Sequence, residues 1–111
     1  MKFGKPPRSV TQKRRMAKLI LAAKAQEDLA AIADFTIETF GTAQARRYSD
    51  ALKASFALLA SNPQIGRDYS HIRPHLRRFE SRSHSIYYFV SRQGVLVARV
   101  LHVRQDPARY L

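Results

Sequence analysis

Apolar residues are concentrated in three short runs in the C-terminal part of the chain, at residues 76–80, 84–91 and 95–104. The tripeptides between these runs, Ser81-Arg82-Ser83 and Arg92-Gln93-Gly94, have the length of hairpin connections. The second and third runs are rich in β-branched and aromatic residues, which favour strands. Neither run alternates cleanly between apolar and polar positions, so we expect at least one strand to be covered on both faces. The pattern predicts a three-stranded antiparallel meander with the upstream elements as its cover.

From Ala25 the spacing of apolar residues changes to three and four, which indicates a helix. Glu27 and Asp28 suit the positive end of its dipole, and Gly41 is expected to stop it. One face of this helix is predicted to be buried and consists of Leu29, Ile32, Ala33, Thr36, Ile37 and Phe40.

A second helix is predicted directly after the first, with Thr42 as its N-cap and Asn62-Pro63 at its end. A break of one or two residues forces the two helices into an antiparallel pair. The buried stripe of the second helix is predicted to consist of Ala45, Tyr48, Leu52, Phe56 and Leu59.

Three further segments complete the predicted fold. Leu19-Ile20-Leu21 is a short strand candidate whose place in the sheet the sequence does not specify. Residues 62–75 read as an irregular loop, long enough to carry function. Asp106-Pro107 resembles an N-cap followed by proline, which predicts a terminal helical turn. The fold class is α+β, in the order β-α-α-β-β-β, with a helical hairpin packed on a small, mostly antiparallel sheet. The predicted core includes Leu29, Ile32, Leu52, Phe56, Leu59, Val97 and Val100.

The composition indicates one domain with an anionic partner. The 111 residues are 45% hydrophobic, enough for a single modest core, and 20 Lys and Arg against 8 Asp and Glu give a formal charge of +12. There is no cysteine, which excludes disulfides and fits a reducing cytoplasm. No apolar run is long enough for a membrane span, and we recognise no secretory signal. We therefore expect a cytoplasmic protein.

Residues 1–15 contain six basic residues and no acid, together with two prolines and a glycine. This composition predicts a disordered basic arm preceding a single domain at residues 16–111. The arm has two interpretations that the sequence leaves open. It attaches to nucleic acid through its charge, or it is an extension upstream of a natural start at Met16.

Several kinds of chemistry lack support in the sequence. The four histidines form no tight pair on one helix and have no acidic cluster beside them, so no metal site is predicted. The glycines stand apart at predicted turns, so no phosphate loop and no nucleotide cofactor is expected. The acids are spread along the chain, which leaves no basis for paired-carboxylate catalysis.

The remaining candidate is a basic cluster on and beside the predicted sheet. Arg99 is unusual within it because it interrupts an otherwise apolar strand. Such a cluster could hold phosphates, with a His or Tyr moving a proton during RNA cleavage. The alternative, which residue types alone favour, is a solvated basic face that meets an acidic partner. The cluster consists of Arg77, Arg78, Arg82, His84, Arg99, His102 and Arg104, with Tyr110 beyond.

The order and spacing of several short motifs resemble the ParE branch of the RelE/ParE toxins. The resemblance covers residues 16–111. The motifs are Ala25-x-x-Asp28-Leu29, Ala45-x-x-Tyr48-x-x-Ala51-Leu52, Asn62-Pro63-x-x-Gly66, Leu76-Arg77-Arg78-Phe79, Ile86-x-Tyr88, Val100-Leu101-His102 and the closing Asp106-Pro107-Ala108-Arg109.

The resemblance implies the toxin of a type II toxin–antitoxin, or plasmid stabilisation, system, neutralised by a ParD-like antitoxin. ParE toxins inhibit DNA gyrase, whereas RelE relatives cut messenger RNA on the ribosome with basic residues and often a C-terminal Tyr or His. Here that RNase set is incomplete, so we expect no enzyme and carry over no catalytic residue. The antitoxin is expected to use a groove beside the sheet for an amphipathic helix or an added strand.

Two alternatives stay open at this point: a ribosome-dependent messenger RNA endonuclease of RelE type, and a non-catalytic nucleic-acid-binding module. Arg78, Arg82 and Arg99 are the candidates for contacts with the target or with phosphate. His102 and Tyr110 are the acid/base candidates for the RNase alternative alone.

Overall fold

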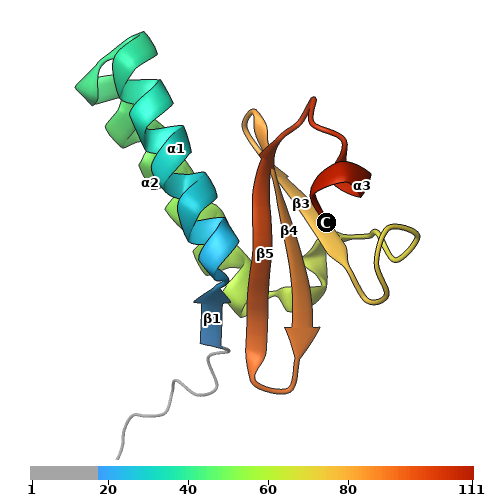
Figure 1. Cartoon of the computed structure of the whole chain (residues 1–111). Helices are drawn as coiled ribbons and strands as arrows, with labels where there is room; N and C mark the ends of the chain where they lie inside the picture. The colour runs from blue at the N-terminus through green and yellow to red at the C-terminus, as the bar shows by residue number, and fades with distance from the viewer. Residues whose placement is uncertain (1–17) are drawn as a thin grey trace, which may run out of the picture.

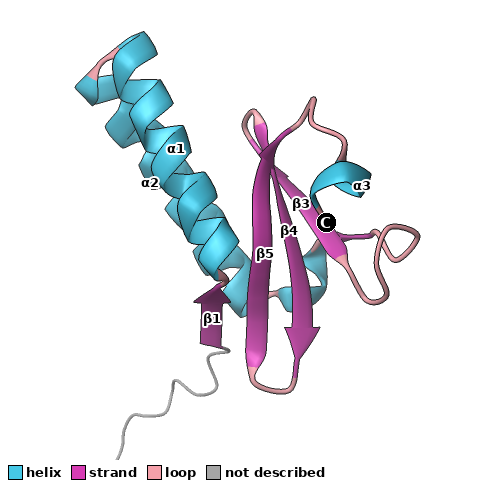
Figure 2. Cartoon of the chain, in the orientation of Figure 1, coloured by secondary structure: helices cyan, strands magenta, loops and turns pink. Residues whose placement is uncertain are grey.

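The computed structural model describes residues 18–111 as an α+β fold, which confirms the predicted class (Figure 1; Figure 2). The predicted arm at residues 1–15, and the start of the predicted domain at Met16, lie outside the described residues. One sheet has the strand order β1-β5-β4-β3-β2. The elements are β1 (Lys18–Leu21), α1 (Ala23–Phe40), α2 (Thr42–Ser61), η2 (Pro63–Ile65), β2 (Arg67–Asp68), β3 (Arg77–Ser81), β4 (His84–Ser91), β5 (Gly94–His102) and α3 (Pro107–Tyr110).

The predicted meander is formed by β3, β4 and β5, each antiparallel to the next. Both faces of this sheet are covered, as the lack of alternation predicted. On one face Ile86, Tyr88 and Val100 pack with residues of α1 and α2. On the other face Tyr87 and Leu101 pack under the segment before β3 and the end of the chain. The covering residues on that second face are Leu76, Tyr69, Ile72 and Leu111.

The first strand, β1, lies at the edge of the sheet and runs parallel to β5. Its first residue, Lys18, is paired with Gly94, which has φ 135°. A β-carbon on Gly94 would lie 1.9 Å from the Lys18 carbonyl oxygen, so a larger residue at position 94 would block the pairing. The structure thus gives this strand the place beside β5 that the sequence did not specify.

The helical hairpin extends beyond the sheet that it covers (Figure 1). Ile37 and Phe40 are therefore 46% and 63% exposed, although helical periodicity predicted that they are buried. Ala33, predicted on the same buried face, is exposed as well. Thr42 was also predicted wrongly as an N-cap: Gly41 occupies that position, and no side chain caps α2. Of the predicted core, Leu52, Leu59, Val97 and Val100 are buried, whereas Leu29, Ile32 and Phe56 are half-buried and pack against it.

The segment at residues 62–75 is not the irregular loop that we predicted. It contains the short helix η2 and the two-residue strand β2, which pairs with β3. Tyr88 holds this segment in place, because its hydroxyl donates to the Pro63 carbonyl oxygen and accepts from the Gly66 N–H, both at 2.8 Å. At the end of the chain, the predicted cap is confirmed: the Asp106 carboxylate accepts from the Ala108 N–H at 3.0 Å.

Candidate functional site on the basic part of the sheet

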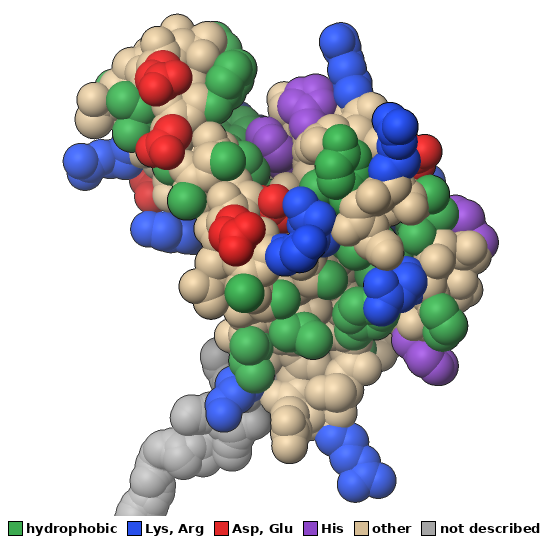
Figure 3. Space-filling view, viewed as in Figure 1, with side chains coloured by type: hydrophobic (Ala, Val, Ile, Leu, Met, Phe, Trp, Pro, Cys, Tyr) green, Lys and Arg blue, Asp and Glu red, His purple; other side chains and the backbone are tan. Residues whose placement is uncertain are grey.

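Basic residues are unevenly distributed over the described chain. Residues 18–61, which contain the helical hairpin, have five basic and five acidic residues, whereas residues 67–111 have nine arginines and three acids. On the face shown in Figure 3, most acidic side chains lie over the hairpin and most basic side chains over the rest of the molecule. An anionic partner would therefore be attracted to the sheet and its connections.

The sheet places Arg78 and Arg99 in one cross-strand row. Both are register partners of Tyr87, Arg78 from β3 and Arg99 from β5. Side chains of directly paired residues lie on the same face of a sheet, so the topology brings together two arginines that are 21 positions apart in the sequence. Their guanidinium groups nevertheless have separate partners.

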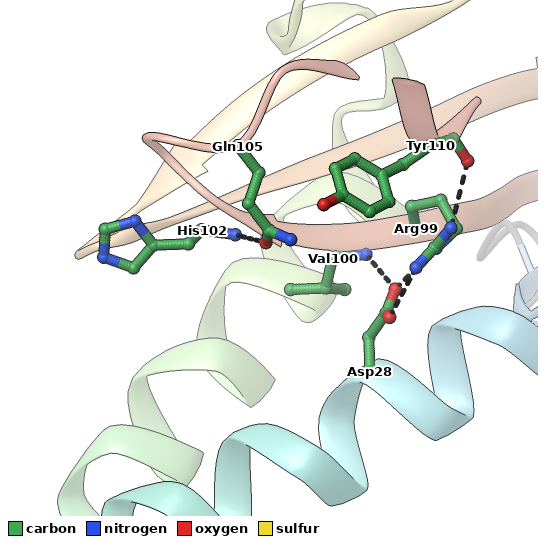
Figure 4. A network of polar contacts seen from close by, with 6 residues as sticks. All are labelled: Asp28, Arg99, Val100, His102, Gln105 and Tyr110. Carbon is green, nitrogen blue, oxygen red and sulfur yellow. Dashed lines mark hydrogen bonds and ion pairs between the residues drawn. The ribbon is translucent and has the colours of Figure 1, made fainter. Parts of the chain in front are cut away.

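Arg99 is held by Asp28 of α1 (Figure 4). Its Nε donates to one carboxylate oxygen at 2.8 Å and its terminal Nη2 to the other at 2.9 Å, while Nη1 donates to the Tyr110 carbonyl oxygen at 3.0 Å. The side chains of Arg99 and Asp28 are only 15% and 14% exposed. The hydrogen bond to Asp28, offset in part by burial, raises the pKa of Arg99 above its usual value.

The Asp28 carboxylate also accepts from the Val100 N–H at 2.9 Å. The pairing of β1 with β5 ends at Val97, so this carboxylate satisfies a backbone group where the edge strand no longer reaches. The prediction that Glu27 and Asp28 lie at the positive end of the helix dipole is wrong, because α1 begins at Ala23 and its first turn contains no acidic residue.

The guanidinium of Arg78 is also engaged in hydrogen bonds within the chain. Its guanidinium donates to Ser85 Oγ at 3.0 Å, to the Tyr69 hydroxyl at 3.1 Å and to Glu80 at 2.7 Å. The third candidate, Arg82, lies in the turn between β3 and β4, exposed and with φ 59°. Arg82 takes part in neither of the two ion pairs found among residues 18–111.

The two acid/base candidates, His102 and Tyr110, have different surroundings. His102 Nδ1 accepts from the Arg104 N–H at 3.1 Å, and its ring centroid lies 5.4 Å from that of His84. Tyr110 is 42% exposed, and its ring centroid lies 5.7 Å from the Arg99 guanidinium carbon. In Figure 4 the His102 ring is directed away from Tyr110.

A contact that the sequence did not reveal joins α2 to the sheet. The Tyr48 hydroxyl lies 2.5 Å from His84 Nδ1 and accepts from the Ser83 N–H at 3.0 Å. Burial, reinforced by the charge of nearby His102, lowers the pKa of His84. Tyr48 was predicted as part of a buried stripe, and nothing in the apolar pattern indicated the partner of its hydroxyl.

The described residues contain neither a metal-binding cluster nor a membrane-spanning helix. Within residues 18–111 no three His, Cys, Asp or Glu side chains are grouped to hold a metal ion. None of the helices described there combines the length and apolar character needed to cross a bilayer.

Comparison with known proteins gives one consistent result. A family model described as the ParE toxin of type II toxin–antitoxin system, parDE, matches residues 19–107. Toxin ParE1 of Mycobacterium tuberculosis is 38% identical over 96 residues, covering 86% of this chain and 98% of that protein. Toxin ParE of Escherichia coli is 36% identical over 93 residues, covering 82% of this chain and 89% of that protein.

A solved structure supports the fold. A chain described as the chromosomal ParDE TA system from P. aeruginosa superposes with a TM-score of 0.70 at 21% identity, covering 80% of this chain and 98% of that chain. The match of the family model to most of the described residues, together with the two relatives, establishes that this chain belongs to the ParE toxins of type II toxin–antitoxin systems.

Proposed function

We propose that this toxin inhibits DNA gyrase in the cytoplasm without catalysing a reaction, and that a ParD-like antitoxin neutralises it. Membership of the ParE family supports the first part. The likeness of its fold to a ParDE chain is consistent with the second.

The observation that carries the non-catalytic proposal is the ion pair between Arg99 and Asp28. RNA cleavage needs cationic groups free to stabilise charge that develops on the phosphate, and an acid or base within hydrogen-bond reach of the reacting oxygen. Two guanidinium nitrogens of Arg99 donate to the Asp28 carboxylate, and the third donates to the Tyr110 carbonyl oxygen. An inhibitor needs only a complementary surface, so an occupied Arg99 does not hinder it.

The helical hairpin of the toxin contains a groove on which the antitoxin could dock. A cleft of about 190 Å³ between α1 and α2 is lined mainly by apolar side chains, including Leu29, Ile32 and Phe56. The hairpin also exposes Phe35 and Phe40. Grooves of this kind accept the apolar face of an amphipathic helix. Acidic residues elsewhere on such a partner would be attracted to the basic sheet, which would accelerate its capture.

The target can be tested with two assays on the purified chain. We expect inhibition of supercoiling by gyrase, relieved by the antitoxin encoded beside the toxin, and intact messenger RNA on ribosomes. His102→Ala and Tyr110→Phe should leave the inhibition of gyrase unchanged. Codon-specific cuts in messenger RNA that either substitution abolishes, with supercoiling undisturbed by the wild-type chain, would instead establish the RNase alternative.

The groove can be tested with a matched pair of substitutions on α1. Both alanines are exposed on the same helix, but Ala33 lines the cleft and Ala31 does not. We expect Ala33→Glu to prevent co-purification with the antitoxin, because a charge would enter an apolar contact, and Ala31→Glu to permit it. Equal co-purification of both variants would place the antitoxin elsewhere.

A further inference from the structure

The turn between β3 and β4 has an unusual backbone conformation. Arg82 has φ 59°, in the left-handed region that glycine, asparagine and aspartate adopt most readily. Ser81 pairs with His84, and a two-residue turn between them requires such a φ. An arginine adopts it at a cost in backbone energy, and strain of this kind clusters at functional sites. Arg82 is also exposed, so packing of its side chain does not explain its presence.

Contacts from two sides hold this turn in place. From α2, the Tyr48 hydroxyl accepts from the Ser83 N–H at 3.0 Å. From the end of β5, the Val103 N–H donates to the Ser83 carbonyl oxygen at 2.9 Å. The turn is therefore a preformed feature of the fold, and the second bond places the chain at Arg104 beside the chain at Arg82.

The hydrogen bonds also assign the protons of two histidines near the turn. The Tyr48 oxygen accepts from Ser83, so its own proton is available to His84 Nδ1, 2.5 Å away. His102 Nδ1 accepts from the Arg104 N–H. Because Nδ1 is an acceptor in both rings, each neutral imidazole has its proton on Nε2. Each ring therefore has one N–H donor, at Nε2.

These groups form one cluster of hydrogen-bond donors, which we call the turn cluster: Arg82, His84, His102 and Arg104. His84 and His102 are direct register partners on β4 and β5, and the two arginines flank the bond between Ser83 and Val103. Neither arginine is in an ion pair within the described residues 18–111, and both are exposed. Two acids lie within two residues of these arginines: Glu80 is paired with Arg78 at 2.7 Å, and the Asp106 carboxylate accepts from the Ala108 N–H at 3.0 Å.

We propose that the turn cluster binds the phosphodiester backbone of DNA. Arginine recognises phosphate through charge and paired N–H donors, and imidazole N–H groups add neutral donors. The two arginines lie exposed at the tip of a hairpin, which suits an extended polyanion better than a small molecule that needs an enclosed pocket. This inference goes beyond gyrase inhibition, and its test contains no gyrase, so either proposal can fail alone.

The test measures direct binding of the full chain to a fluorescein-labelled DNA duplex by anisotropy, over a range of salt concentrations. Arg82→Gly and Arg104→Ala are compared with Arg92→Ala. Arg92 is exposed, is in no ion pair among residues 18–111 and lies in the turn at the other end of β4, so it matches the charge that is removed. Residues 1–17 are present in every variant, so their contribution cancels in the comparison.

We expect each turn-cluster substitution to remove one phosphate contact. The slope of log K against log salt should then fall by about one, and binding at roughly 0.1 M salt should weaken roughly eightfold. Arg92→Ala should change binding by less than about twofold if Arg92 makes no such contact. Arg82→Gly should also melt at a higher temperature than the wild type, because glycine adopts φ 59° without strain, so its weaker binding would not reflect unfolding.

Three results would overturn the proposal. The first is an equal loss of binding in Arg92→Ala, which would mean that only net charge matters. The second is unchanged DNA binding in both Arg82→Gly and Arg104→Ala. The third is displacement of the labelled DNA by polyglutamate as effectively as by unlabelled DNA, which would assign the turn cluster to an acidic peptide.

Discussion

Replacing Asp28 by asparagine should destabilise the fold strongly, although the change only replaces one carboxylate oxygen with an NH₂ group. In the wild type, this carboxylate accepts from two nitrogens of Arg99 and from the Val100 N–H. The amide oxygen can keep at most two of these bonds, those that Arg99 Nε and the Val100 N–H make to the same carboxylate oxygen, while its NH₂ group turns a donor toward the Arg99 Nη2 donor. Arg99, only 15% exposed, would be left with a buried charge that lacks its counterion.

Removing one partner of a buried ion pair typically costs about 3–5 kcal/mol. Both side chains here are about 85% buried, so little of that cost is relieved by solvent. Because asparagine retains one acceptor, we expect the lower part of the range, about 3 kcal/mol. With a urea dependence of roughly 1–3 kcal/mol per molar, the midpoint of unfolding should fall by about 1–3 M.

Urea titration followed by circular dichroism measures this change, and Glu80→Gln is the matched control. It also removes the acidic partner of an arginine, but Glu80 is 60% exposed, and Arg78 keeps its bonds to Ser85 and Tyr69. An exposed pair contributes less than about 1 kcal/mol.

The double variant Asp28→Asn/Arg99→Gln should recover part of the loss, because the uncompensated charge is gone. Equal shifts for Asp28→Asn and Glu80→Gln, or a shift below about 1 kcal/mol for Asp28→Asn, would refute the reasoning.

Three further predictions concern the sheet and its connections. Gly94→Ala should detach β1, since the added carbon would lie 1.9 Å from the Lys18 carbonyl oxygen; hydrogen exchange should then accelerate at residues 18–21 and stay slow in the helices. Tyr88→Phe leaves the buried Gly66 N–H without its acceptor and should cost about 1–3 kcal/mol, measured by thermal unfolding. Because burial lowers the pKa of His84, the unfolded chain binds its proton more readily than the folded chain, so stability should fall as pH drops below the usual histidine pKa of about 6.5. His84→Asn should weaken that dependence, and an unchanged pH profile in this variant would contradict the assignment.

The sequence by itself determined the elements in which apolar residues recur at a regular spacing, together with local turns and the cap at the end of the chain. The strands at residues 84–91 and 94–102, the helices on either side of Gly41 and the Asp106 cap follow from local periodicity and local turn chemistry, and the structure places them within a few residues of the predicted bounds. The spacing of short motifs was also sufficient to recognise the family. The strand β2 was not predicted because a strand of two residues is too short to show a periodic pattern.

Only the tertiary structure decided which of the basic residues are available to a partner. Arg99 was conspicuous in the sequence as a charge within an apolar strand, and a buried charge requires a counterion. The chain contains eight acids, however, and Asp28 lies 71 positions away, a separation that leaves no local pattern. The contacts of Tyr48 with His84 and of Arg78 with Tyr69 could not be predicted from the sequence for the same reason. Local spacing specifies which residues share a face of one element, whereas the partners of polar side chains depend on how separate elements pack against one another.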